Sequence, residues 1–175
     1  GVMSVAPGML LVATAALRDP NFLDTVVLVL DVNDDGCVGV VLNRPSGIPV
    51  ADVLENWGDV VTGPEVLFRG GPVALQGALG LAYLGDLADA PLGWRVVEGR
   101  LGILDLDTPR ELVSGSLQGL RIFAGYAGWG AGQLESEIAE GSWYVVAGEV
   151  DDVFADATTQ LRLAVLRRQP GMLAW

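Results

Sequence analysis

TVVLVLDVNDDGCVGVVL, residues 25–42, is the stretch that decides the fold. Its first part, Thr25 to Asp31, is rich in valine and leucine, which is typical of a strand buried on both faces. Asn33-Asp34-Asp35-Gly36 supplies turn residues, and Cys37 to Leu42 forms a second apolar run. The stretch therefore predicts a β-hairpin. A calcium loop is the weaker interpretation of its acidic turn, because the spacing and the terminal bidentate glutamate are missing.

Further strand candidates lie on both sides of the hairpin and are separated by turn residues. They are residues 9–14, 66–69, 79–84, 95–97, 101–104, 120–124 and 142–147. Helices are predicted at 49–57, from Thr108 to a point before Gly119, at 132–140 and at 156–168. Hairpins mixed with a few short helices indicate an α+β fold, and the length suits one domain, residues 1–175.

Two of the predicted helices rest on capping signals. In Thr108-Pro109-Arg110-Glu111, threonine caps, proline takes the first helical position, and Glu111 completes a capping box. Asp156 is the expected cap of the last helix. These signals predict where each helix begins.

The composition excludes several kinds of chemistry. Histidine is absent, and with it the commonest general base and metal ligand. All ten basic residues are arginines, which we attribute mainly to GC-rich codons, so Schiff-base chemistry and a phosphate-loop lysine are excluded. The formal charge of −12 opposes nucleic-acid binding, which depends on neutralising phosphates with cations. No catalytic apparatus is recognisable, and we expect neither a cofactor nor a metal.

The apolar pattern of the sequence bears on cellular location and on the environment of the single cysteine. No apolar run approaches the roughly 18 residues of a membrane span, and no signal-peptide pattern opens the chain, so we expect a cytoplasmic protein without membrane contact. Cys37 lies in an apolar run and is expected to be a buried, unreactive thiol.

The glycine-rich segment GYAGWGAG, residues 125–132, is the most suggestive for binding. Glycines ahead of a helix can present backbone N–H groups to an anion, but Glu135 and Glu137 follow and would repel one. Tyr126 and Trp129 line a pocket or partner surface, or else pack in a core with Trp143.

Asn43-Arg44-Pro45 follows the hairpin directly. Arg44 is one of few cations, so it is a candidate for binding a carboxylate or phosphate, the alternative being a structural ion pair with one of many acids. Acid pairs such as Asp105 with Asp107 could hold Mg²⁺ or act as acid and base, but 22 acids give such pairs by chance.

Taken together, the segments resemble the AlgH/YqgE family of bacterial proteins. The matching stretches occur in order over nearly the whole chain. They are GMLLVAT (8–14), DPNF (19–22), DDGCVGVVLNRP (34–45), FRGGPV (68–73), GWRVVEG (93–99), LGILDLD (101–107), LRIFAGYAGWGAGQLESEIAEGSWYVV (120–146) and RRQPG (167–171).

The resemblance implies a sheet that curls into a partial barrel with a few short helices. It brings no accepted catalytic residues, and the label of transcriptional regulator rests on a genetic effect in some members. We therefore expect a non-catalytic binding or regulatory module for a protein or small molecule. The alternatives are a DNA-associated regulator and a carboxylate- or Mg²⁺-dependent hydrolase. The candidate binding residues are Asn43, Arg44, Gly70, Gly71, Tyr126, Trp129, Gln133 and Glu135.

Overall fold

A computed structural model describes residues 4–169 of the chain. The strands are β1 (Leu10–Ala13), β2 (Val26–Asn33), β3 (Gly36–Val41), β4 (Pro45–Pro49), β5 (Val66–Arg69), β6 (Val73–Leu84), β7 (Trp94–Glu98), β8 (Leu101–Leu104), β9 (Leu117–Gly130) and β10 (Trp143–Val146). The α-helices are α1 (Val50–Val53), α2 (Gln133–Ala139), α3 (Val150–Val153) and α4 (Thr158–Arg167). Pro170 and Gly171 of the RRQPG match lie outside the described residues.

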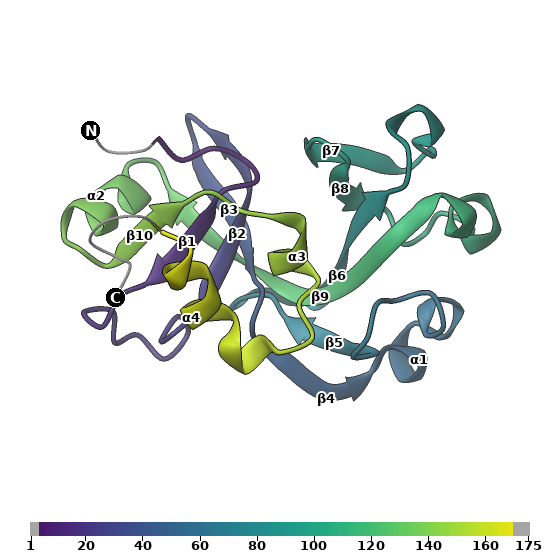
Figure 1. The fold of residues 1–175 in the computed structure, drawn as a ribbon, viewed down its shortest axis with the longest axis horizontal. Helices are drawn as coiled ribbons and strands as arrows, with labels where there is room; N and C mark the ends of the chain where they lie inside the picture. Colours follow the sequence, from purple (N-terminus) through teal and green to yellow (C-terminus); the bar gives the residue numbers. More distant parts are fainter. Residues whose placement is uncertain (1–3, 170–175) are drawn as a thin grey trace.

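The strands form one sheet whose order is β10-β1-β2-β3-β9-β6-β8-β7, with β4 and β5 attached beside it. The long strand β9 is the spine, because one end pairs with β3 and the other with β6. Among the described strand pairs, β5 with β9 is parallel and the others are antiparallel. The sheet curls into a half-barrel (Figure 1), which confirms the predicted α+β fold.

The hairpin of β2 and β3 forms as predicted. Asn33 pairs with Gly36 at its tip, and the Asn33 side-chain oxygen accepts a hydrogen bond from the Asp35 N–H at 2.8 Å. Gly36 has φ = 135°, and a Cβ there would lie 1.9 Å from the Trp129 carbonyl oxygen. The turn therefore needs glycine for close packing against β9.

The core explains why β1 and the first part of β2, Val26 to Leu30, are continuously apolar. Alternate residues of the two strands face opposite sides of the sheet, and both sides are covered. Leu10, Val12 and Leu28 pack with Leu161 and Val165 of α4, which lies across the front of the sheet in Figure 1. The remaining side chains, including Leu11 and Val27, pack with Trp129, Leu134 and Trp143.

The helix predicted from Thr108 does not form. Its place is taken by two 3₁₀ turns, Arg110–Leu112 and Ser114–Ser116, separated by Val113 with φ = −124°. Val113 is fully buried whereas Leu112 is 67% exposed, so the segment has no apolar stripe to pack a helix. Capping signals alone do not stabilise a helix this short.

Two other helix predictions need smaller corrections. The helix expected at 49–57 is broken at Leu54, which separates α1 from a 3₁₀ turn at Glu55–Trp57. α4 begins at Thr158 with Ala157 as its N-cap, so Asp156 is not the cap. Within residues 4–169, no helix is long and apolar enough to cross a membrane.

The glycine-rich segment is mostly strand, which corrects the prediction that the strand before it ends at Ala124. β9 continues through it to Gly130. A Cβ on Gly70 would lie 2.3 Å from the Gly125 carbonyl oxygen, and one on Gly71 would lie 2.2 Å from the Tyr126 carbonyl carbon. Gly70, Gly71 and Gly125 therefore serve the close approach of two backbones, whereas a Cβ on Gly130 or Gly132 would meet nothing within 4 Å.

Candidate functional site

Asn43 and Arg44 fix the turn at residues 19–24. The Asn43 side chain accepts from the Val26 N–H at 3.0 Å and donates to the Asp24 carbonyl at 3.0 Å. The Arg44 guanidinium donates to three carbonyl oxygens of the turn, those of Asn21 (2.7 Å), Pro20 (3.0 Å) and Leu23 (3.1 Å). The sequence analysis gave an ion pair with an acidic side chain as the structural role of Arg44. Its guanidinium instead donates to backbone carbonyls.

Trp129 belongs to a buried aromatic cluster. Its ring centroid lies 5.7 Å from that of Phe22 and 5.9 Å from that of Trp143. One carboxylate oxygen of Glu137 accepts from both indole N–H groups, each at 3.0 Å, and the other accepts from Gln133 at 3.0 Å. With Trp129 only 5% exposed, the cluster is core packing.

The eight candidate residues do not line one continuous surface. Arg44 and Gly71 line a hollow of about 270 Å³ together with Asn21, Arg69, Pro72 and Leu75. Gly70 is buried, and its N–H donates to the Ala124 carbonyl at 2.8 Å.

The candidates on β9 and α2 lie apart from that hollow. Tyr126 and Trp129 are three residues apart on β9, so their side chains point to opposite faces of the strand. Both border a second hollow of about 380 Å³ at the tip of the β2–β3 hairpin. Glu135 is exposed on α2. The turn at residues 19–24 connects the two regions, because Phe22 packs on Trp129 while its neighbour Asn21 bonds to Arg44.

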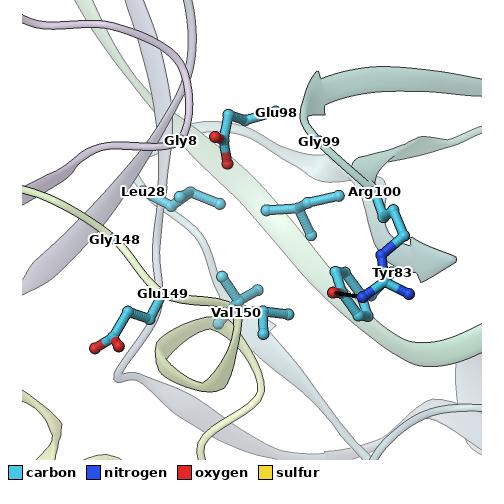
Figure 2. Close-up of a pocket in the computed structure, with 11 residues that line it drawn as sticks. Gly8, Leu28, Tyr83, Glu98, Gly99, Arg100, Gly148, Glu149 and Val150 are labelled. Atoms are coloured by element: carbon cyan, nitrogen blue, oxygen red, sulfur yellow. Dashed lines mark hydrogen bonds between the residues drawn. The ribbon is translucent and has the colours of Figure 1, made fainter. Parts of the chain in front are cut away.

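A cleft that sequence reasoning missed lies where the two ends of the curled sheet face each other (Figure 2). Its volume is about 360 Å³. The N-terminal segment and β2 supply Gly8 and Leu28, and the region from β6 to β8 supplies Tyr83, Glu98, Gly99, Arg100 and Leu101. The C-terminal arm closes the cleft with Gly148, Glu149, Val150 and Val153. These residues share no local motif, so only the strand register brings them together.

The cleft combines an apolar floor with a charged rim. Leu28, Leu101 and Val153 are buried beneath it. The Arg100 guanidinium stands 4.6 Å over the Tyr83 ring and donates to the Tyr83 hydroxyl and to the Gly85 carbonyl. Figure 2 shows the Glu98 carboxylate pointing into the cleft.

Glu149 is part of the rim but is directed elsewhere. Its carboxylate points away from the cleft (Figure 2) and pairs with Arg168. Arg168 also forms a bidentate pair with the buried Asp152, at 2.6 and 2.8 Å. The hydrogen bond that Arg168 donates to Asp152 is the main cause that raises the pKa of Arg168. This ion-pair network fixes α3 and with it one wall of the cleft.

Two other titratable groups are strongly perturbed by burial. Burial, with smaller contributions from Glu135 and Asp31, raises the pKa of Cys37 to about 11, in keeping with the predicted buried thiol. Burial lowers the pKa of Arg121 to about 10; its guanidinium lies 4.3 Å over the Phe68 ring. Among residues 4–169, no three histidine, cysteine, aspartate or glutamate side chains group closely enough to hold a metal ion.

Known proteins of similar sequence and structure share this architecture. A UPF0301 protein from Streptomyces avermitilis is 53% identical over 175 residues, which cover 98% of this chain and 91% of that protein. A crystal structure of a Corynebacterium diphtheriae protein superposes with a TM-score of 0.93 at 32% identity, covering 99% of this chain and 92% of that one.

A solution structure extends the similarity to a named protein. AlgH from Pseudomonas aeruginosa matches with a TM-score of 0.68 at 27% identity, over 97% of this chain and 99% of that one. The model of the AlgH-like family matches residues 10–174. The chain therefore belongs to the AlgH-like family.

Proposed function

We propose that this protein is a non-catalytic binding module that holds a small amphipathic molecule in the cleft of Figure 2. The cleft carries the proposal, because it is concave, has a buried apolar floor, and presents a few polar groups at its rim. The Glu98 carboxylate has no hydrogen bond or ion pair among the described residues. It therefore favours a ligand with a cationic or hydrogen-bond-donating group beside an apolar body.

The chemistry of the lining favours binding over catalysis. Its side chains include no serine, threonine, cysteine or lysine to act as a nucleophile. Arg100 is engaged by Tyr83 and Gly85, and Glu149 by Arg168. One free carboxylate, Glu98, does not supply the acid and base pair that a hydrolase of the carboxylate type requires.

The arrangement of the arginines supports a small ligand over DNA. Binding to the phosphate backbone requires cations free to neutralise it. Six of the ten arginines instead use part of their donor set on carbonyls, carboxylates or a hydroxyl of the protein itself, so few guanidinium groups are fully free for an extended phosphate backbone. Those engaged in this way are Arg44, Arg100, Arg110, Arg121, Arg162 and Arg168.

We propose a cytoplasmic location, where the free thiol of Cys37 stays reduced.

A pair of probes tests the cleft directly. Tyramine carries a cationic amine on an aromatic body, and 4-ethylphenol is its uncharged analogue. Under titration at millimolar concentration, both are expected to shift the methyl NMR signals of Leu28, Leu101 and Val150, with tyramine binding more tightly. Glu98→Gln should abolish the difference between the two probes because it removes the free negative charge.

Matched variants separate the cleft from general surface binding. Val150→Phe places a larger side chain in the cleft and should abolish binding of both probes. Val53→Phe makes the same change on α1, where the side chain is 58% exposed, and should leave binding unchanged. If neither probe moves the cleft methyl signals, or if Val150→Phe binds like the unmodified chain, the proposed function is wrong.

A further inference from the structure

A pair of arginines faces the hollow between β4, β5 and the start of β6. β4 and β5 are antiparallel, with Pro45 opposite Phe68, so one step along the ladder places Arg44 opposite Arg69. The Arg69 N–H donates to the Arg44 carbonyl at 2.8 Å, which confirms this register. Residues directly opposite share a face of the sheet, and both arginines line the same hollow of about 270 Å³.

The two like charges have no counter-ion among the described residues. The ion pairs of residues 4–169 involve Arg110 and Arg168, and neither Arg44 nor Arg69 has a carboxylate within 4.0 Å. Like charges directly opposite across a ladder destabilise a sheet. In a chain with 22 acidic residues and ten arginines, the composition predicts that each arginine lies near a carboxylate. This arginine pair does not.

The two guanidinium groups play different parts in this hollow. Arg44 is held rigidly by its bonds to three carbonyls of the turn, which leaves two of its five N–H donors available. Arg69 is exposed and makes no side-chain hydrogen bond within the described part of the chain. The hollow thus offers one preorganised cation and one that is free to close on a ligand.

We propose that this hollow binds the phosphoryl group of a small phosphate monoester. A phosphoryl group carries close to two negative charges at pH 7, which match the two guanidinium charges, and its oxygens accept bidentate hydrogen bonds from arginine. The opposite wall is apolar: Pro72 and the 59% exposed Leu75 border the hollow and contact the organic part of the ester. The site is separate from the cleft of Figure 2, and the two proposals stand independently.

Calorimetric titration with phenyl phosphate, alongside inorganic phosphate, tests the site. Arg69→Gln removes the free cation without disturbing the turn that Arg44 holds. The affinity for phenyl phosphate is expected to fall at least about tenfold, because a charge-assisted hydrogen bond is lost. Arg95→Gln is the matched control, since Arg95 is also exposed on a strand but lies outside the hollow; it should leave the affinity within about twofold.

The unliganded protein gives a second readout. Arg69→Gln should raise the melting temperature relative to Arg95→Gln, because it relieves the repulsion from Arg44; a purely structural role for Arg69 would lower it. Equal affinity for phenyl phosphate in the two variants overturns the proposal. Inorganic phosphate binding as tightly as phenyl phosphate overturns the assignment to a monoester, because the apolar wall then contributes nothing.

Discussion

The effect of removing the Glu137 side chain on the free energy of unfolding can be worked out from its hydrogen bonds. One of its carboxylate oxygens accepts from the indole N–H groups of both Trp129 and Trp143, at 3.0 Å each. These two indoles are 5% and 3% exposed, so few other acceptors reach them. Glu137→Ala leaves both donors unpaired while keeping a good helix former in α2.

The expected loss in the free energy of unfolding follows from the number of buried donors that are left without an acceptor. A buried donor left without a partner costs about 1–3 kcal/mol, so two cost about 2–6 kcal/mol. Glu137 itself is only half-buried, so water entering the vacated space will accept part of the hydrogen bonding of the two indole N–H groups. We therefore expect Glu137→Ala to lower the free energy of unfolding by about 2–4 kcal/mol.

A conservative variant refines this prediction. In Glu137→Gln the amide oxygen still accepts from both indoles, but its NH₂ group then faces the Gln133 NH₂ group. Gln133 cannot simply flip, because its oxygen accepts from the Gly130 N–H at 3.0 Å. The hydrogen bond between residues 133 and 137 is lost, and the free energy of unfolding is expected to fall by about 1 kcal/mol.

Urea denaturation followed by circular dichroism and tryptophan fluorescence measures both losses from the shift of the midpoint at constant slope. Glu135→Ala, an exposed change on the same helix, is the control and should stay within about 0.5 kcal/mol of the unmodified chain. If Glu137→Ala loses less than about 1 kcal/mol, the two indole hydrogen bonds do not stabilise the fold as argued.

Three further perturbations have defined outcomes. Arg121→Met should lower the free energy of unfolding by about 2–4 kcal/mol in urea, because the carbonyls of Gly63, Val153 and Ala155 lose the donor that binds them; equal stability would show that water replaces the guanidinium. The Cys37 thiol should resist a disulfide reagent at pH 8 until urea unfolds the chain. Its pKa rises from 9.0 to about 11 on folding, so its contribution to stability is complete below about pH 9 and is lost as the pH rises towards 11. Gly71→Ala should lose at least about 3 kcal/mol in a thermal melt, since its Cβ would collide with the Tyr126 backbone, whereas Gly47→Ala, with nothing within 4 Å, should be neutral.

Local chemistry explains which elements could be predicted from the sequence. The hairpin of β2 and β3 was predictable, because its turn residues and apolar runs are contiguous. The helix expected from Thr108 was wrong for the opposite reason. Its capping signals are local, but a helix there needed an apolar stripe to pack, and the exposed Leu112 shows that none exists.

Long-range contacts account for what could not be predicted. Gly125 of β9 is required by the close approach of Gly71, which lies more than fifty residues earlier in the chain, so nothing within the segment itself predicts that the strand continues past Ala124. The cleft of Figure 2 depends on the register that sets Tyr83 opposite Leu101, and on the C-terminal arm that covers it. Arg44 was recognised as a candidate, but its partner Arg69 emerges only from the pairing of β4 with β5.

Three arginines of this acidic chain share one structural use. Arg44, Arg121 and Arg162 each direct a guanidinium at backbone carbonyls of loops, turns or the ends of helices and strands, and Arg44 and Arg121 each reach three of them. A planar guanidinium spreads its five donors over three nitrogen atoms and so reaches carbonyls that lie apart, whereas an ammonium group presents its three donors from a single atom. We attribute the choice of arginine over lysine mainly to codon bias, but the contacts described here use the geometry of the guanidinium. Arg69 stands apart from this pattern: it faces a hollow and makes no side-chain hydrogen bond in the described structure. That contrast supports the proposal that this hollow is where the protein binds an anion, although the chain as a whole is acidic.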